Sequence, residues 1–318
     1  MGLYYRHLTK EDRIVIRTLM QEGKSKIYIA GCLGRAYSTI KRELRRNSGR
    51  RGYRPKQAQE RAEARLRIPR TKKLTQEILM HIEKKLREDY SPEQVSGTME
   101  KTIGVRISPE RIYQHLWQEK RAGGNLYRHL RIASGRKRRK RYGKKDWRGR
   151  IPGCIGIEER PAVVERKSRF GDWEADLVSG AHHRGFLVTL VERKSKFTLI
   201  DSVAKKTAAA VSAEIIRLLS RLRQRVWTIT YDNGREFASH QEINATLGCR
   251  SYFANPYRSW ERGLNENTNG LLRQYFPKNL DLRRVKAEAI DFVQRRLNSR
   301  PRKTLDFRTP EEVFLKAG

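Results

Sequence analysis

Three acidic residues stand in segments whose patterns suit a site for divalent metal ions. Asp232 follows the β-branched and aromatic run 226–231 and begins an Asp-Asn-Gly turn, so we expect its carboxylate at the carboxyl end of a buried strand. Asp176 lies in an earlier strand-like run, and Glu266 lies in a later helical pattern. Taken alone, the Asp-Asn-Gly tripeptide is typical of a plain turn. A catalytic interpretation therefore depends on the three acids meeting.

If they meet, the chemistry they suit is phosphoryl transfer. Hard divalent cations prefer oxygen ligands, and two of them about 3.5–4 Å apart can activate a nucleophile and stabilise the leaving oxygen. His182 and His183 fall in a predicted turn, and we expect them to be exposed because a two-metal site needs no histidine base.

The elements that must position these acids alternate between strand and helix. Three strand patterns joined by short turns are followed by helix, strand, helix, strand and helix, which predicts an α/β domain with a mixed, five-stranded sheet. The strands are expected at 173–178, 185–193, 196–203, 226–231 and 250–253, and the helices at 208–222, 240–247 and after residue 263. On the last helix Glu266, Asn269 and Arg273 share one face. We expect Asn269 and Arg273 to position DNA, although a solvated helix charge explains Arg273 equally well.

The net charge points to a nucleic-acid partner. The chain carries a formal charge of +36 at pH 7, and residues 1–150 hold 41 Lys and Arg against 15 Asp and Glu. Such self-repulsion is best tolerated when a polyanion neutralises it. There is no apolar run of membrane-spanning length and no signal segment, so we expect no membrane partner and a cytoplasmic, nucleoid-associated protein.

The amino-terminal residues predict a helix-turn-helix domain. Thr9 and Ser25 are helix caps, Gly23 and Gly34 end the first two helices, and a basic third helix runs from about Tyr37. A recognition helix in the major groove needs such basic side chains. A plain three-helix unit with a solvated basic face is the alternative. The expected DNA contacts are Thr39, Lys41, Arg42, Arg45 and Arg46.

A second helical unit follows, with caps at Thr75, Ser91 and Ser108 and proline after each serine. It resembles a second helix-turn-helix with Arg111 and Gln114 available to DNA, but a simple helical bundle fits as well. The basic run after it is expected along phosphates through Arg138, Arg139 and Arg141. The expected domains are 1–50, a basic linker 51–73, 74–132, a second basic linker 133–160, and a catalytic domain 161–318.

Cys32, Cys154 and Cys249 are far apart and have no histidine at ligand spacing. They predict neither a zinc module nor a disulfide framework, and we expect all three to be buried.

The combination of motifs resembles one family of enzymes. Asp232 and Glu266 are 34 positions apart, a separation similar to that of the Asp-Asp-Glu triad of RNase H-like transposases and retroviral integrases. The whole chain resembles the bacterial transposases named after insertion sequence thirty. Ala175 and Tyr231 depart from the glycine and threonine usual there, and neither change removes a metal ligand. The motifs are 5–9, 29–35, 38–43, 91–94, 171–176, 232–237, 266–273, 297–303 and 309–312.

The resemblance implies an RNase H-like catalytic domain that holds two Mg²⁺ ions, with Mn²⁺ as a substitute. Asp176 would bridge the ions, with Asp232 on one and Glu266 on the other. It further implies binding of double-stranded DNA at terminal inverted repeats, nicking and joining of strands, a circular intermediate, and a homodimer or larger assembly. A catalytically inactive DNA-binding regulator is the alternative. A phage- or virus-type integrase is less favoured, because no zinc module precedes the core.

Overall fold

The computed structural model describes residues 7–67, 74–131, 151–222, 225–256 and 258–316. The chain divides into two compact units, residues 1–73 and 74–318, which are described separately. Arg138, Arg139 and Arg141 lie outside the described residues. None of the helices in the described ranges is long and apolar enough to cross a membrane.

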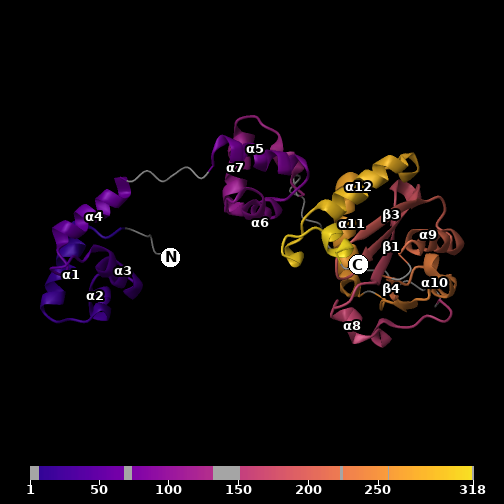
Figure 1. Ribbon diagram of the computed structural model, residues 1–318, viewed down its shortest axis with the longest axis horizontal. Coiled ribbons are helices and arrows are strands. Elements are labelled where there is room, and N and C mark those ends of the chain that lie inside the picture. Colours follow the sequence, from indigo (N-terminus) through magenta and orange to yellow (C-terminus); the bar gives the residue numbers. More distant parts are fainter. Residues whose placement is uncertain (1–6, 68–73, 132–150, 223–224, 257, 317–318) are drawn as a thin grey trace. The chain divides into compact units, whose positions relative to one another are not determined.

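The described residues of the first unit form four helices, α1 (Lys10–Gln21), α2 (Lys26–Cys32), α3 (Tyr37–Asn47) and α4 (Pro55–Arg67) (Figure 1). Thr9 caps α1 in a capping box with Asp12, and Ser25 caps α2. Since α4 contributes Ala58 to the core of this unit, it is part of the folded body. The core residues are Ile16, Ile29, Ala30, Ile40, Leu44, Tyr53 and Ala58.

The second unit begins with a three-helix module of α5 (Gln76–Arg87), α6 (Pro92–Ile103) and α7 (Pro109–Arg121). The caps are those expected: Thr75, Ser91 and Ser108 each accept a hydrogen bond from the first turn of their helix. The module has an apolar core of its own, which consists of Ile82, Leu86, Val95, Met99, Ile107, Ile112, Leu116 and Leu126.

A five-stranded sheet forms the centre of the rest of the second unit. Its order is β3-β2-β1-β4-β5, in which β1 pairs antiparallel with β2 and β2 with β3, whereas β1 and β4, and β4 and β5, are parallel. The predicted mixed sheet and its α/β order are confirmed. The strands are β1 (Asp172–Ser179), β2 (Phe186–Glu192), β3 (Thr198–Val203), β4 (Thr228–Tyr231) and β5 (Arg250–Phe253).

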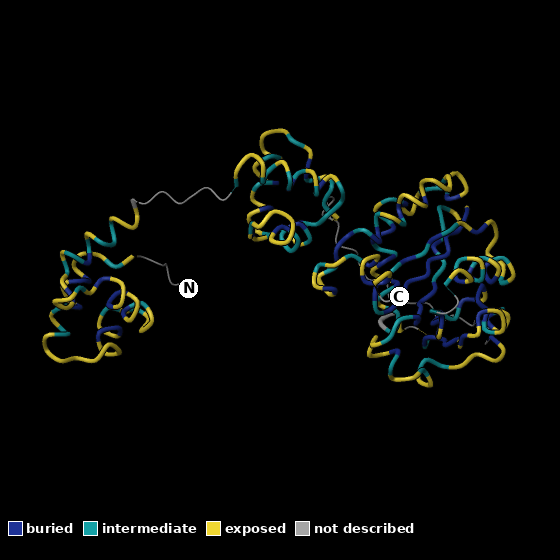
Figure 2. The backbone as a smooth tube through the Cα atoms, viewed as in Figure 1, coloured by how far each residue is buried: buried dark blue, intermediate teal, exposed yellow. Residues whose placement is uncertain are grey.

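Helices cover both faces of the sheet, and Figure 2 shows the strands as the most buried part of this unit. Alternate residues of β1 face opposite sides. Trp173 and Ala175 belong to the cluster that includes residues of α9 (Ala208–Ser220) and α10 (His240–Leu247). Val178 belongs to the cluster with α11 (Gly263–Tyr275) and α12 (Ala287–Ser299). Two short helices complete the unit, α8 (Ala162–Glu165) and α13 (Pro310–Leu315).

The three-helix module contacts the segment that follows α12. The side chain of Gln94 donates a hydrogen bond of 2.7 Å to the carbonyl of Pro301, and the Tyr90 hydroxyl donates one of 3.1 Å to the carbonyl of Ser299. Gly97 lies so close to the Phe307 ring that a Cβ atom there would fall 2.3 Å from it. The fit of α6 against this segment therefore depends on a glycine inside the helix.

The expectation that all three cysteines are buried is wrong for two of them. Cys249 is buried, but Cys32 and Cys154 are exposed. A small thiol is tolerated at the surface as well as in the core, so residue type alone does not decide its burial.

Candidate active site

Asp232 follows β4 directly, as the strand pattern predicted. One of its carboxylate oxygens accepts a hydrogen bond of 2.9 Å from the backbone amide of Gly234, and Asn233 donates one of 2.5 Å to the carbonyl of Ala254 beyond β5. A Cβ atom on Gly234 would lie 2.8 Å from the Asp232 carboxylate. The turn thus fixes the carboxylate at the end of the strand, and glycine makes room for it.

Asp176 lies in the second half of β1, and its carboxylate is held by two donors. Oδ1 accepts from the Leu177 amide at 3.0 Å, and Oδ2 accepts from the Asn269 side chain of α11 at 2.5 Å. The buried hydroxyl of Thr189, opposite Asp176 on β2, lies within hydrogen-bond distance of two acceptors, the side-chain oxygen Oδ1 of Asn269 at 3.4 Å and the backbone carbonyl of Asp176 at 3.3 Å. Asn269 therefore fixes the orientation of the Asp176 carboxylate.

The two aspartates share one cation. Arg262, the residue before α11, places Nη1 3.6 Å from Oδ1 of Asp176 and Nη2 3.4 Å from Oδ2 of Asp232. The Arg262 side chain is 15% exposed, that of Asp176 is 20% exposed, and that of Asp232 is 37% exposed. Two carboxylates carried by different strands thus converge on a single positive charge.

Glu266 lies one helical turn after Arg262 and is exposed. It lines the same groove, of about 770 Å³, as Asp176, Arg262, Asn269 and Arg273. Among the residues that the structure describes, no three His, Cys, Asp or Glu side chains are gathered closely enough to hold a metal ion. The possible metal ligands at the groove are carboxylate and amide oxygens, which Mg²⁺ and Mn²⁺ prefer. The guanidinium of Arg262 lies between two of the carboxylates. The chemistry of these oxygens therefore fits a divalent cation.

Burial raises the pKa of the Asp176 carboxyl above its usual value, and the nearby Asp232 carboxylate adds to the increase. Arg262 and the hydrogen bonds from Leu177 and Asn269 act in the opposite direction. The ionised form of Asp176 is therefore disfavoured at this buried position, and a bound cation would stabilise it.

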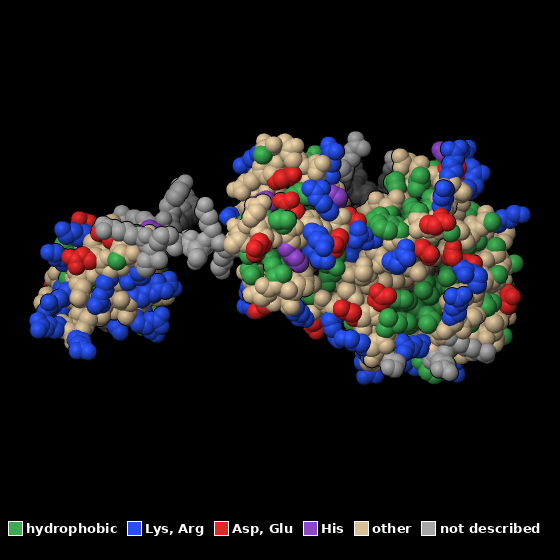
Figure 3. Space-filling view, turned by 45° about the horizontal axis from the view of Figure 1, so that its top comes forward, with side chains coloured by type: hydrophobic (Ala, Val, Ile, Leu, Met, Phe, Trp, Pro, Cys, Tyr) green, Lys and Arg blue, Asp and Glu red, His purple; other side chains and the backbone are tan. Residues whose placement is uncertain are grey.

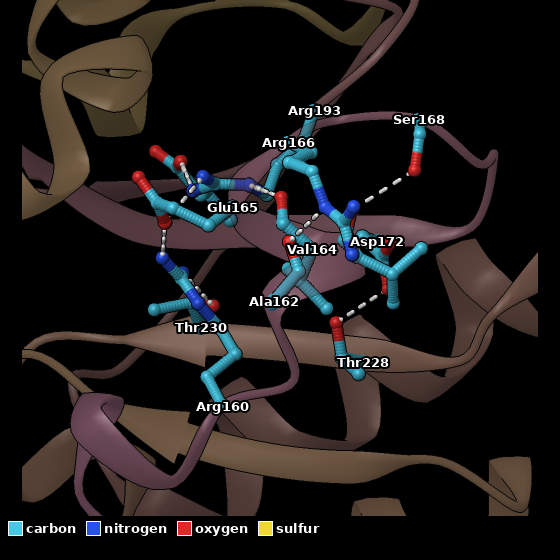
Figure 4. Close-up of polar contacts among 12 residues, drawn as sticks. Arg160, Ala162, Val164, Glu165, Arg166, Ser168, Asp172, Arg193, Thr228 and Thr230 are labelled. Carbon is cyan, nitrogen blue, oxygen red and sulfur yellow. Dashed lines mark hydrogen bonds and ion pairs between the residues drawn. The ribbon is translucent and has the colours of Figure 1, made fainter.

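A buried ionic network lies on the α11 side of β1. Glu174 pairs with Arg193, and its other oxygen accepts a hydrogen bond of 3.2 Å from the Asn265 amide. Figure 4 shows how Arg193 and Arg160 both reach Glu165. Arg193 also donates to the carbonyl of Val164 at 3.2 Å. The network ties the first turn of α11 to β1 and to the segment that precedes the sheet.

The residues expected to contact DNA are placed as follows. Lys41, Arg42, Arg45 and Arg46 are exposed on α3, whose buried positions are Ile40, Glu43, Leu44 and Asn47, while Thr39 is half-buried. Figure 3 shows basic side chains gathered over the first unit. Arg111 and Gln114 are exposed on α7 and hydrogen-bonded to each other at 2.9 Å. His182 and His183 are exposed, as expected.

Arg262 was not predicted at this site, and Glu174 was expected to have a structural or surface role but not to pair with Arg193. Arg262 stands four positions before Glu266, the spacing that puts two residues on one helical face, and this was the signal that could have found it. Glu174 stands two positions before Asp176, on the same face of β1. Its pairing with Arg193 depends on how β1 and β2 meet, which the spacing does not show.

Comparison with known proteins identifies the family. A model described as a helix-turn-helix domain matches residues 4–47. A transposase for insertion sequence element IS4351 from Bacteroides fragilis is 41% identical, with 97% of this chain and 95% of that protein covered. The transposase InsI for IS30A from Escherichia coli K12 is 38% identical, with 97% and 83% covered, and a transposase for IS1086 from Cupriavidus metallidurans is 37% identical, with 98% and 94% covered.

The chain belongs to the insertion-sequence-thirty family of transposases. This transposase is an enzyme that binds DNA and acts in transposition. Among solved structures, the catalytic core domain of BIV integrase is similar over 47% of this transposase and 96% of its own chain, with 21% identity and a TM-score of 0.38.

Proposed function

We propose that this transposase cleaves and joins DNA strands at the groove beside Asp176, Asp232 and Glu266. The observation that carries the proposal is the convergence of Asp176 and Asp232 on one guanidinium, because it marks a place where two carboxylates require positive charge. Glu266, on the adjoining helix, lines the same groove and supplies the third carboxylate.

The cofactor proposed is a pair of Mg²⁺ ions, with Mn²⁺ as a substitute, held by Asp176, Asp232 and Glu266. When bound, such ions activate the attacking oxygen and stabilise the leaving one. Asn269 keeps the Asp176 carboxylate in place through its 2.5 Å hydrogen bond. Arg273 lines the groove beside the acids, and its positive charge would attract a DNA phosphate to them.

Two displacements make up the proposed reaction. In cleavage, the oxygen of water bonds to a phosphorus at the end of the element, the bond from that phosphorus to the 3′ oxygen breaks, and a 3′-hydroxyl and a 5′-phosphate result. In transfer, that 3′-hydroxyl attacks a phosphorus in another strand, which loses its own 3′ oxygen as a new 3′-hydroxyl. Each step forms one P–O bond and breaks one.

Recognition of the element is assigned to the amino-terminal helices. The terminal inverted repeats would be bound by the first domain through α3, with the second helical module and the basic segment after it gripping phosphates. Because two element ends must be brought together, the working form would be at least a homodimer, and the product of joining the ends would be a circular intermediate. This work on genomic DNA would place the protein at the nucleoid in the cytoplasm.

The test uses the purified full chain, Mg²⁺ and labelled DNA carrying an end of the element. Wild-type protein should give nicked and joined products, and Asp232→Asn should reduce both by about a thousandfold or more while leaving DNA binding intact. Asp291→Asn is the matched control, since Asp291 is exposed on α12. Footprinting of the end DNA with no product from wild type would overturn the proposal in favour of a DNA-binding regulator.

A further inference from the structure

Arg262 has a feature that a simple structural ion pair lacks. Its guanidinium reaches two carboxylates at once, but at 3.4 and 3.6 Å, which is beyond the usual length of a charge-assisted hydrogen bond. Its Nη1 also donates a hydrogen bond of 3.4 Å to the carbonyl of Ala175. The charge is well placed between the acids, but it is held loosely.

The oxygens that Arg262 faces are those that a metal ion would need. Oδ2 of Asp176 accepts a hydrogen bond from Asn269, and Oδ1 of Asp232 accepts one from the Gly234 amide. Arg262 faces the opposite oxygen of each carboxylate, Oδ1 of Asp176 and Oδ2 of Asp232. Oδ1 of Asp176 also accepts a hydrogen bond of 3.0 Å from the Leu177 amide, and its second lone pair is open to a cation. Mg²⁺ binds oxygen at about 2.0–2.1 Å, so a cation and the guanidinium cannot lie between these two oxygens together.

We propose that Arg262 is a built-in counterion that joins Asp176 to Asp232 in the metal-free enzyme, leaves when a divalent cation enters, and then binds a phosphate of the DNA strand in the groove. The last part rests on the function proposed above. In the metal-free state Arg262 prevents the two carboxylates from repelling each other. After exchange, the same charge is available beside the acids that act on the DNA.

The local structure allows this exchange without movement of the helix. Arg262 is the residue before α11, and the next residue, Gly263, is exposed, with no atom of the described residues within 4 Å of its Cβ position apart from its chain neighbours and the backbone of its own helix. The first turn of α11 is held separately, because Glu174 binds the Asn265 amide. The long side chain of Arg262 can therefore swing into the groove, which it already lines together with Glu266 and Arg273, while the acids stay in place.

The proposal is tested by measuring Mn²⁺ binding to the full chain in the absence of DNA. The electron paramagnetic resonance signal of free Mn²⁺ reports how much of the ion is bound. Arg262→Ala should bind Mn²⁺ about tenfold more tightly than wild type, because the ion no longer has to break two partly exposed ion pairs. The same variant should melt at a lower temperature without metal, and added Mn²⁺ should raise its melting temperature more than that of wild type. Arg262→Lys should lie between wild type and Arg262→Ala.

Arg258→Ala is the matched control. It removes the same charge from the same loop, but Arg258 pairs with Glu261 at 3.6 Å and not with the two aspartates. Its Mn²⁺ affinity should stay within about twofold of wild type. Unchanged or weaker Mn²⁺ binding by Arg262→Ala would overturn the proposal. If the role of Arg262 were purely structural, its removal would lower the stability of the protein without tightening Mn²⁺ binding. Equal tightening by Arg258→Ala would also overturn it, because net charge would then explain the effect.

The proposed binding of a DNA phosphate by Arg262 is tested by a separate measurement of DNA affinity. With Ca²⁺ in place of Mg²⁺, Arg262→Ala should bind a labelled end DNA about fivefold more weakly than wild type, and unchanged affinity would overturn this part. The Mn²⁺ measurement needs neither DNA nor turnover. A wild-type protein that binds Mn²⁺ in competition with Arg262 but yields no nicked DNA would therefore contradict the proposed function and leave the exchange standing.

Discussion

The carboxylate of Glu174 on β1 accepts a hydrogen bond of 3.2 Å from the backbone amide of Asn265 on α11. Asp176 lies two residues after Glu174 on the strand, and Asn269 lies four residues after Asn265 on the helix. The Asp176 carboxylate accepts a hydrogen bond from the Asn269 side chain. Two strand residues span about 6.6 Å and four helical residues about 6 Å, so the two contacts match in spacing. This match holds α11 in the register that brings Glu266 and Arg273 to the groove.

Glu174→Gln should therefore lower both stability and activity. Glu174 and Arg193 are nearly completely buried, and loss of Glu174 leaves the buried charge of Arg193 paired with the largely exposed Glu165, which compensates it less well. We expect a loss of about 3 kcal/mol in the free energy of unfolding, measured by urea denaturation, together with slower nicking. The double variant Glu174→Gln, Arg193→Met should regain part of the stability, because an apolar replacement of both partners costs less than a broken pair. Glu159→Gln, at an exposed position, should change stability by less than about 0.5 kcal/mol, and an equal loss there would contradict this account.

The exposed face of α3 leads to a prediction about DNA affinity. Arg42→Ala combined with Arg45→Ala should weaken binding of the end DNA, and the slope of log affinity against log salt should become shallower by about 0.9 for each phosphate that is no longer neutralised. Both arginines are exposed on α3. Lys56→Ala, at an exposed position of α4, serves as the control and should change neither quantity measurably. An unchanged salt slope in the double variant would mean that this face does not meet phosphates.

Local patterns predicted most of the elements because their causes lie within a few residues. Ser91 and Ser108 cap the helices that proline begins, and the run before Asp232 forms β4 as expected. The contact of Arg262 with Asp176 could not be predicted, because it joins residues 86 positions apart (262 minus 176) through the placement of a loop over the sheet. The same holds for Glu174 and Arg193, which meet only because β1 and β2 pair in one register.

The contact between Gly97 and Phe307 gives a prediction that opposes helix propensity. Alanine is favoured over glycine by about 1 kcal/mol inside a helix, yet Gly97→Ala should lower the melting temperature because its Cβ would lie 2.3 Å from the Phe307 ring. Gly31→Ala is the matched control, since Gly31 lies in α2 and, in the described part of the chain, its Cβ position has no atom within 4 Å apart from its chain neighbours and its own helix backbone. It should leave stability unchanged or improve it. Phe307→Ala in the Gly97→Ala background should restore part of the loss, and no restoration would show that the ring is not the obstacle.

The hairpin between β2 and β3 provides a prediction about pH. Burial lowers the pKa of Lys196 from its ordinary value of 10.5 to about 8, and its ammonium group donates to the carbonyl of Arg193. Between these two values the unfolded chain holds a proton that the folded chain has released, so Lys196 favours unfolding as the pH falls from 10.5 towards 8. As far as Lys196 is concerned, the free energy of unfolding is therefore highest above pH 10.5, decreases as the pH falls towards 8, and is lowest below pH 8.

Lys196→Met keeps the aliphatic chain and removes this titration. The free energy of unfolding of wild type minus that of Lys196→Met should increase by about 1 kcal/mol between about pH 7.5 and pH 9, as measured by urea denaturation at each pH. Taking the difference cancels the groups that both proteins share, including the buried tyrosines. A difference that stays flat or falls with increasing pH would contradict the lowered pKa, because a lysine that keeps its proton in both states contributes no slope in this range.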